Sequence, residues 1–501
     1  MLLQYFVTTF DSTLMASAHP VITSYFHSSN SASWLSTAFM LTSTAFQPLF
    51  ARVSDMVGRR PLYIFALTMF IATTAWCALA QSMGSFIAAR AFCGLGAGGV
   101  MTMASIITND LVRIEVRGTY QSYINIFFGL GSSCGAAFGG YLCDTIGWRW
   151  TFGIQIPPIV LILIAAFITT PHDLGPNLAK HSNQSFGQVL KGFDITGSLL
   201  LTTSAAALIL GLNLGGNIFP WQHPIIIISL IVSVLAGLLL IRVESRAPRP
   251  VMPLAMLSQS PRANLVFSNF FAMIGINTVI FNAPLYFQAV KLDSASMSGF
   301  RLALPSASLT VCAVGVGFFM TRTGRMYGPI VAGSLSMIIG ASCLAAMWDG
   351  IPMWLATAFV IPPSLGQGLM FPVCSVAVLA VSSQADQAVM TSTLSLWRNL
   401  GTVMGVAVSS LIVQNSLVVY LNKYITGADK AETINRIRKA VRAIQDLDPL
   451  HQHEAMTAYS AALRITFLSA IIFFAITTAL ALPIKLPLLG RSQPADEENS
   501  A

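Results

Sequence analysis

Long apolar runs follow one another along most of this chain, and each is about as long as a membrane is thick. The chain has 501 residues, of which 54% are hydrophobic and only 9% are charged, whereas ordinary soluble domains carry about 25% charged residues. Only helices and closed barrels satisfy their backbone hydrogen bonds in lipid. The runs are continuous and lack the alternation of barrel strands. The sequence therefore predicts an all-α polytopic membrane protein.

A helix needs about 20 apolar residues to cross a bilayer, and about fourteen segments of the chain meet that length. The first of them has no basic residues before it and is too long for the apolar core of a signal peptide, so it is read as a span. We predict spans near residues 2–25, 33–50, 62–81, 84–108, 118–142, 150–170, 195–214, 224–243, 263–289, 302–320, 328–348, 353–381, 389–414 and 462–485.

Basic residues in the short connecting segments indicate how these spans are oriented. The loop after the second predicted span contains Arg52, Arg59 and Arg60, and the loop after the fourth contains Arg113 and Arg117. Short cytosolic loops of membrane proteins are enriched in Lys and Arg, so these loops and both chain termini are predicted to face the cytosol. This loop bias accounts for the net charge of +8, and nucleic acid is therefore excluded as a partner.

Three charged residues lie deep inside the predicted spans: Asp11, Arg90 and Arg398. A charge near the centre of a spanning helix costs roughly 2.5–3.5 kcal/mol on insertion scales, so such residues are usually functional. A carboxyl group in a low dielectric can exchange a proton near neutral pH. These residues are predicted to couple proton movement to substrate movement, and the alternative is a set of structural ion pairs. If Asp11 is an unpaired charge, its neutralisation should leave the fold intact.

The loop after the second predicted span carries a motif of the form D-x-x-G-R-R, made by Asp55, Gly58, Arg59 and Arg60. The glycine permits a tight turn, and the acid and the arginine can pair across a helix end. This loop resembles the signature of the major facilitator superfamily, G-x-L-x-D-x-x-G-R-K/R, although its first glycine is missing. A weaker echo at residues 321–325 stands where a second half would repeat the loop. The resemblance implies two related six-helix bundles.

The chain is accordingly predicted to divide into two halves with an insertion between them. In order, the parts are an N-terminal six-helix bundle at 1–170, a cytosolic linker at 171–194, two inserted helices at 195–243, a second cytosolic linker at 244–262, a C-terminal six-helix bundle at 263–485 and a cytosolic tail at 486–501. Within the second bundle, residues 415–461 are predicted to form a long non-cytosolic loop. Helical spacing of Ile434, Ile437, Val441 and Ile444 predicts a surface helix there, and Asp448-Pro449 predicts the start of another.

Further motifs resemble the fourteen-helix drug:proton antiporter branch of that superfamily. The first span reads D-x-T from Asp11, and Arg90 in the fourth span is followed by closely spaced glycines. The fifth span matches the antiporter glycine motif at Gly131, Gly135, Gly139 and Gly140, with Ala136 in place of its proline. Small residues four apart let two helices approach closely. Segments near 109–129 and 287–299 look similar to a fungal subgroup that includes vacuolar basic amino-acid transporters and toxin exporters.

The resemblance implies a proton-coupled antiporter that exports small organic solutes, drugs or toxins from the cytosol by alternating access. One alternative is a vacuolar-membrane transporter of basic amino acids, and a more distant one is a non-transporting membrane sensor. An anionic cavity, to which Asp11 would contribute, would favour cationic substrates. The expected partners are a small-molecule substrate, protons and the lipid bilayer of the plasma or vacuolar membrane, and the chain is expected to be a monomer.

Several residues receive roles from this resemblance. Asn125, Gln155 and Asn282 are candidate cavity residues, and buried hydrogen bonds between helices are an equally good explanation for them. Asp55, Arg59 and Asp110 are expected to clasp the cytosolic side when the cavity opens outward. We find no catalytic motif and no metal-ligand spacing among the seven cysteines, so neither enzymatic activity nor a cofactor nor a metal is expected.

Overall fold

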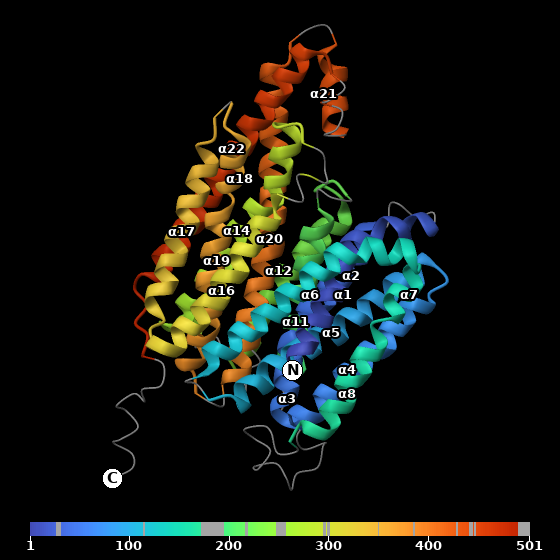
Figure 1. The fold of residues 1–501 in the computed structure, drawn as a ribbon, viewed down its shortest axis with the longest axis vertical. Helices are drawn as coiled ribbons and strands as arrows, with labels where there is room; N and C mark the ends of the chain where they lie inside the picture. The colour runs from blue at the N-terminus through green and yellow to red at the C-terminus, as the bar shows by residue number, and fades with distance from the viewer. Residues whose placement is uncertain are drawn as a thin grey trace.

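Two bundles of long helices make up the computed structural model of this protein (Figure 1). The structure describes the chain apart from residues 27–31, 114–115, 172–194, 216–218, 247–256, 294–296, 298–300, 349, 384–385, 427–428, 440–443, 445–446 and 489–501. Most of the two predicted linkers and of the predicted tail therefore lies outside the described residues. The same holds for the side chain of Asp55.

The N-terminal half, blue to cyan in Figure 1, is built around one hydrophobic core that includes Leu14, Phe70 and Phe86. Its helices are α1 (Leu2–Tyr25), α2 (Ala32–Ala45), α3 (Gln47–Val57), α4 (Arg59–Leu79), α5 (Met83–Leu111), α6 (Arg117–Thr145), α7 (Trp148–Gly153) and α8 (Ile156–Thr169). The second and sixth predicted spans are each broken into two helices. Pro48 and Pro157 lie in the first turns of α3 and α8, where a missing N–H leaves no hydrogen bond unmade.

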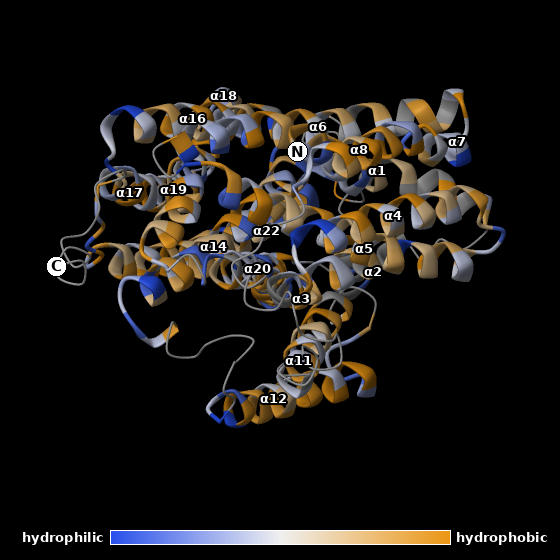
Figure 2. Ribbon diagram, turned by 90° about the horizontal axis from the view of Figure 1, so that it is seen from below, coloured by the Kyte–Doolittle hydropathy of each residue, from blue (hydrophilic) through white to orange (hydrophobic). Residues whose placement is uncertain are grey.

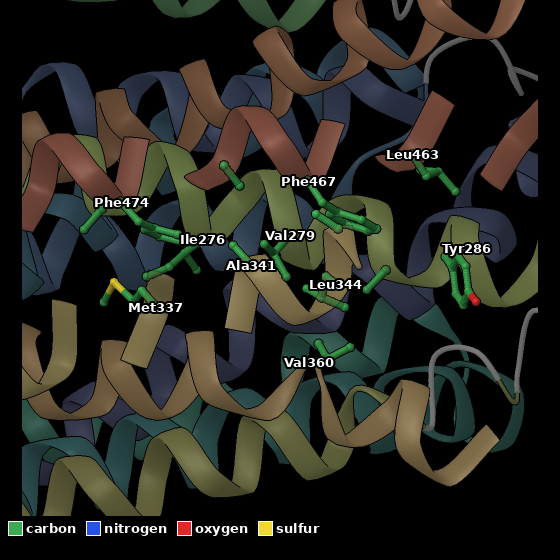
Figure 3. Packing of buried hydrophobic residues seen from close by; sticks show 14 of the residues in the cluster. Ile276, Val279, Tyr286, Met337, Ala341, Leu344, Val360, Leu463, Phe467 and Phe474 are labelled. Atoms are coloured by element: carbon green, nitrogen blue, oxygen red, sulfur yellow. The ribbon is translucent and has the colours of Figure 1, made fainter. Parts of the chain in front are cut away.

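The C-terminal half, yellow-green to red in Figure 1, has its own core. Its helices are α14 (Arg262–Ala289), α16 (Ala303–Thr323), α17 (Tyr327–Ala345), α18 (Met353–Ala358), α19 (Ile361–Ala380), α20 (Gln387–Tyr424), α21 (Lys430–Lys439) and α22 (Pro449–Ala481). Figure 3 shows Ile276, Met337 and Phe474 of this core close together, and all three are buried.

Between the halves in sequence, α11 (Ile195–Leu214) and α12 (Pro224–Glu244) form a helix pair that lies to one side of the bundles (Figure 2). Helix α11 packs on α2 of one half and on α20 of the other. A small apolar cluster there joins the inserted pair to both halves, and its buried members are Ala45, Leu201, Ala205, Leu240 and Leu396. The inserted pair therefore covers the seam between the two halves.

Ten helices in the described part of the chain are long and apolar enough to cross a membrane. Helical structure is also present in the ranges of the remaining predicted spans. The all-α membrane architecture is confirmed, and the count of fourteen spans stays a prediction.

The predicted loop at 415–461 is largely helical. Helix α20 continues through the predicted span to Tyr424, and α22 begins at Pro449 rather than near 462. The 38 residues of α20 are about 57 Å long at 1.5 Å per residue, well beyond the roughly 30 Å hydrocarbon core. The predicted surface helix is present as α21 at Ile434 and Ile437, with Ile437 buried, while Ile444 lies beyond its end and Val441 lies outside the described residues. The Asp448 side chain caps α22 by accepting from the His451 N–H.

Candidate functional site

A cavity of about 390 Å³ lies between the two halves. Residues of α5 and α6 from the N-terminal half and of α14, α16, α19 and α20 from the C-terminal half form most of its wall. The wall mixes aromatic side chains such as Phe128 and Phe371 with polar ones such as Asn125 and Ser375. Small-molecule sites typically have volumes of about 300–1,000 Å³ and this kind of mixed lining. The cavity is therefore the candidate substrate site.

Arg398 of α20 is a charged residue on this wall. Its Nη2 donates to Oδ1 of Asn269 at 3.1 Å and to Oγ of Ser375 at 3.2 Å. The guanidinium carbon lies 4.9 Å from the centre of the Phe371 ring. Its Nε is buried and has no hydrogen-bond partner in the described structure. These described contacts are all neutral, so Arg398 places a positive charge at the cavity without a carboxylate beside it.

Amide side chains stand on both sides of the cavity. On α6, Asn125 Oδ1 accepts from Nε2 of Gln121 at 3.3 Å, and Asn125 Nδ2 has no partner among the described residues. On α19, Gln367 Oε1 is likewise buried without a described partner. Such atoms leave hydrogen-bonding capacity at the wall for a solute or for water. Gln367 has no motif around it and was not predicted from the sequence.

Asp11 of α1 and Arg90 of α5 form an ion pair inside the N-terminal half. Arg90 Nη1 lies 2.8 Å from Oδ2 and 3.1 Å from Oδ1 of Asp11. The two side chains are 0% and 1% exposed. The Cys93 sulfur is 3.8 Å from Nη1 of Arg90, and the Phe39 ring centre is 4.3 Å from the guanidinium. The pair is therefore sealed between apolar neighbours.

This pair corrects two expectations. Asp11 is not an unpaired charge, so its neutralisation would leave Arg90 buried without a counter-ion, a change that typically costs about 3–5 kcal/mol. The described cavity wall also includes neither Asp11 nor Arg90. Asp11 therefore does not make the cavity anionic in this conformation.

Two other candidate cavity residues are buried within the halves instead of lining the described wall. Gln155, 3% exposed, donates to the Thr151 carbonyl at 3.1 Å. Asn282, 1% exposed, donates to the Thr278 carbonyl at 2.8 Å. Both amides bond back to the preceding helical turn, because that carbonyl is the nearest acceptor for a side chain in apolar surroundings.

The glycine motif brings α6 into close contact with α1. A Cβ added at Gly131 would collide with the Phe6 carbonyl oxygen, and one at Gly135 would collide with that of Phe10. Two threonines of α1 stabilise this contact, because Thr9 and Thr13 donate to carbonyls of α6 at 3.3 and 3.0 Å. Gly139 is buried on the same stripe, one turn further on, and Gly140 follows it in α6. Helices α1 and α6 therefore behave as one packed unit.

The D-x-x-G-R-R loop organises one end of the N-terminal half. Gly58 joins α3 to α4 with a φ of +96°, a conformation that favours glycine. Arg59 is 1% exposed; its Nε lies 3.0 Å from Oδ2 of Asp110 and its Nη1 donates to Ser54 Oγ at 2.6 Å. Arg60 donates to the Phe167 carbonyl. Arg59 and Asp110 belong to the same half, so their pair fixes the end of α5 and does not itself bridge the halves.

Hydrogen bonds that do cross between the halves lie near this same end. Asn109 Nδ2 donates to Thr391 Oγ1 at 3.5 Å, and Arg117 Nη2 donates to Gln387 Oε1 at 3.4 Å. Asn109 directly precedes Asp110, so the acid that pairs with Arg59 holds a residue of the crossing contact in position. We call the end that carries Gly58, Asn109 and Gln387 the basic end.

Helices α6 and α16 provide a second set of crossing bonds. The hydroxyls of Thr119 and Thr321 are 2.9 Å apart, and Ser122 Oγ donates to the Val314 carbonyl at 2.9 Å. The two halves are therefore joined by polar contacts on α6 as well as at the end of α5.

Comparison with known proteins agrees with this architecture. The Major Facilitator Superfamily model matches residues 1–406. The chain is 34% identical over 478 residues to the multidrug resistance protein fnx1 of Schizosaccharomyces pombe, covering 94% of this chain and 88% of that protein. It is 32% identical over 400 residues to vacuolar basic amino acid transporter 2 of Saccharomyces cerevisiae, covering 79% and 84%.

Among solved structures, the human organic anion transporter MFSD10 superposes with a TM-score of 0.60 at 13% identity, covering 94% of this chain and 97% of that one. At that identity the likeness concerns the fold alone. The family match covers most of the chain and the long apolar helices fit it. This chain therefore belongs to the Major Facilitator Superfamily and is a multi-pass membrane transporter of small molecules.

Proposed function

We propose that this protein is a proton-coupled antiporter that exports small organic solutes, drugs or toxins from the cytosol by alternating access. The central cavity would hold the solute, and the Asp11–Arg90 pair would be the coupling site. The observation that carries this proposal is that pair, 2.8 Å long and 0% and 1% exposed. Intramembrane ion pairs are expensive and commonly mark proton pathways.

The position of the pair suggests how a proton could act on the cavity. Thr9 and Thr13 tie α1 to α6, and α6 carries Asn125 on the cavity wall. Helix α5 is tied instead to α2, where Thr42 donates to the Ala91 carbonyl at 2.6 Å. The Asp11–Arg90 pair joins these two units. A proton on Asp11 would remove its charge and weaken the link, so that α6 could shift against α5 and change the cavity.

The crossing contacts support a gate at the basic end. If that end faces the cytosol, as the loop charges predict, the Asn109–Thr391 and Arg117–Gln387 bonds would close the cytosolic side of the cavity. Arg59 and Asp110 would hold Asn109 in place from within the N-terminal half. Release of these bonds would open the cavity to the cytosol for loading.

The relative from Saccharomyces cerevisiae supports a second candidate function, transport of basic amino acids into the vacuole. Both functions move a solute out of the cytosol against protons, and they differ in substrate and membrane. Uptake of labelled lysine and arginine, compared with a drug panel in the same proteoliposomes, separates them.

The coupling proposal is tested with the double variant Asp11→Asn with Arg90→Gln, which removes both buried charges together. We expect it to keep solute counterflow, which needs no proton gradient, and to lose uphill accumulation driven by an imposed pH gradient. The matched control is Asp293→Asn with Arg301→Gln, which removes another ion pair of 2.6 Å from the C-terminal half and should keep accumulation. Uphill accumulation by the Asp11–Arg90 double variant would exclude this pair as the coupling site.

A further inference from the structure

The charge on the cavity wall is positive. The charged residues of the described wall are Arg117 and Arg398, and no aspartate or glutamate of the described chain lines it. Two described acids of the N-terminal half, Asp11 and Asp110, are each matched by an arginine, and Glu115 lies outside the described residues. Asp11 lies 2.8 Å from Arg90, and Asp110 lies 3.0 Å from Arg59. Neither supplies a free negative charge to a bound solute.

We propose that the cavity selects solutes that carry a single carboxylate, which Arg398 binds, and that it disfavours cationic solutes. This inference rests on the proposed role of the cavity as the substrate site. A guanidinium in a low-dielectric environment is costly unless a counter-ion accompanies it. Arg398 has neutral described partners in Asn269 and Ser375, and its Nε has no described partner. A carboxylate accepting from that Nε would form a charge-assisted hydrogen bond.

The assignment of one carboxylate to Arg398 follows from the partners of the two arginines. Arg117 is held at the basic end by the Asn109 carbonyl at 2.6 Å and by Gln387 at 3.4 Å. Gln387 and Arg398 lie eleven residues apart on α20, which is about 16 Å along the helix axis between their backbones. Arg117 already has partners at the basic end, so we assign the carboxylate to Arg398. One carboxylate at Arg398 therefore satisfies the charge of the site.

The other wall residues indicate which chemical groups the rest of the solute should carry. Phe128 and Phe371 offer aromatic surface, while Asn125 Nδ2 is a donor and Gln367 Oε1 an acceptor without described partners. The matching solute has an aromatic or aliphatic body with neutral polar groups. A lysine or arginine molecule could place its carboxylate at Arg398, but its cationic side chain would find no acid on the described wall.

Equilibrium binding of three probes with one ring system tests the charge preference directly. Indole-3-acetate, indole-3-acetamide and tryptamine share the indole ring and carry charges of −1, 0 and +1 at neutral pH. Titrated into the full-length protein in detergent by calorimetry, indole-3-acetate should bind at least about 10-fold more tightly than the amide, with tryptamine weakest, since a hydrogen bond to a charged group is worth about that ratio. Arg398→Gln should remove the preference, and Arg398→Lys should retain part of it.

Arg242→Gln is the matched control, because it removes one positive charge from an exposed position on α12, away from the cavity. It should leave all three affinities unchanged. Tryptamine binding as tightly as indole-3-acetate to the unmodified protein would overturn the inference, as would a carboxylate preference that survives Arg398→Gln. Binding is measured without a membrane gradient. If the expected order of affinities is not found, the proposal of proton-driven accumulation is not affected. If accumulation fails, the order of affinities can still hold.

Discussion

The two halves of this protein share one helix-packing arrangement and differ in where they place charge. In each half, two glycines four residues apart lie against carbonyl groups of the first helix of that half. The corresponding contacts are Gly131 with Phe6, Gly135 with Phe10, Gly401 with Phe270 and Gly405 with Ile274. Small residues at this spacing permit close helix contact, so α1 with α6 and α14 with α20 are equivalent pairs.

By the same correspondence, Asp11 of α1 occupies the position equivalent to Gly275 of α14. Phe128 of α6 is likewise equivalent to Arg398 of α20. Where the N-terminal half has a sealed carboxylate, the C-terminal half has a glycine whose space is taken by Phe474, with a ring carbon 2.5 Å from a Cβ built there. Where the N-terminal half presents a phenylalanine to the cavity, the C-terminal half presents an arginine. The repeat therefore preserves backbone packing, while the polar chemistry differs between the halves.

The largest effect is expected from filling the shared glycine contact. Gly135→Leu and Gly405→Leu each push a side chain into a backbone carbonyl, that of Phe10 in one half and that of Ile274 in the other. Both should abolish transport and lower the yield of monodisperse protein by at least about 10-fold, since backbone cannot relax as a flexible side chain does. Gly315→Leu, where a Cβ meets nothing within 4 Å, is the control and should purify normally. Normal behaviour of only one of the two glycine variants would break the equivalence.

A smaller effect, about 3–5 kcal/mol of unfolding free energy, is expected for Asp11→Asn alone, because it leaves Arg90 buried without its partner. Adding Arg90→Gln should restore part of that loss. Arg398→Gln in the other half should be much milder, since the described partners of Arg398 are neutral. Thermal unfolding of the unmodified protein and these three variants measures the losses in stability. A double variant as unstable as Asp11→Asn would show that the loss does not come from leaving Arg90 without its partner.

Gly275→Ala tests the position of the C-terminal half that is equivalent to Asp11. The added methyl group meets the Phe474 ring, so we expect a loss of about 1–3 kcal/mol. Phe474→Leu removes that collision, so the double variant should lose less than the sum of the two single variants in the same unfolding assay. Strictly additive losses would show that the ring does not occupy the space in question.

The smallest effect is expected at the contacts between the halves. Asn109→Ala and Gln387→Ala each remove one long hydrogen bond, of 3.5 and 3.4 Å. Turnover should change by about 2- to 5-fold, as expected for long hydrogen bonds of which one is neutral and the other comes from the Arg117 guanidinium, and solute affinity should stay within experimental error. Counterflow rates and binding titrations of the same preparations separate the two. A change in affinity without a change in rate would argue against a gate at the basic end.

Much of the fold could be predicted because lipid leaves few choices for the backbone. The apolar runs predicted helices throughout, and even the surface helix around Ile437 was visible from its spacing. The extension of α20 to Tyr424 was missed, because its last turns are too polar to be counted as a membrane span although they continue the helix. The breaks beside Pro48 and Pro157 follow from proline chemistry at a helix start.

The sequence by itself determined which charges are exceptional: Asp11, Arg90 and Arg398 stand out because a spanning helix excludes charge. It could not determine which of them pair, since pairing depends on how α1 and α5 face each other across a separation of 79 positions. Only the tertiary structure decided that Asp11 and Arg90 neutralise one another away from the cavity, while Arg398 remains on its wall. The physical reason is that insertion of a helix into a membrane depends on its local composition. The sign of the charge on a cavity wall depends on side chains from several helices, which meet only after packing.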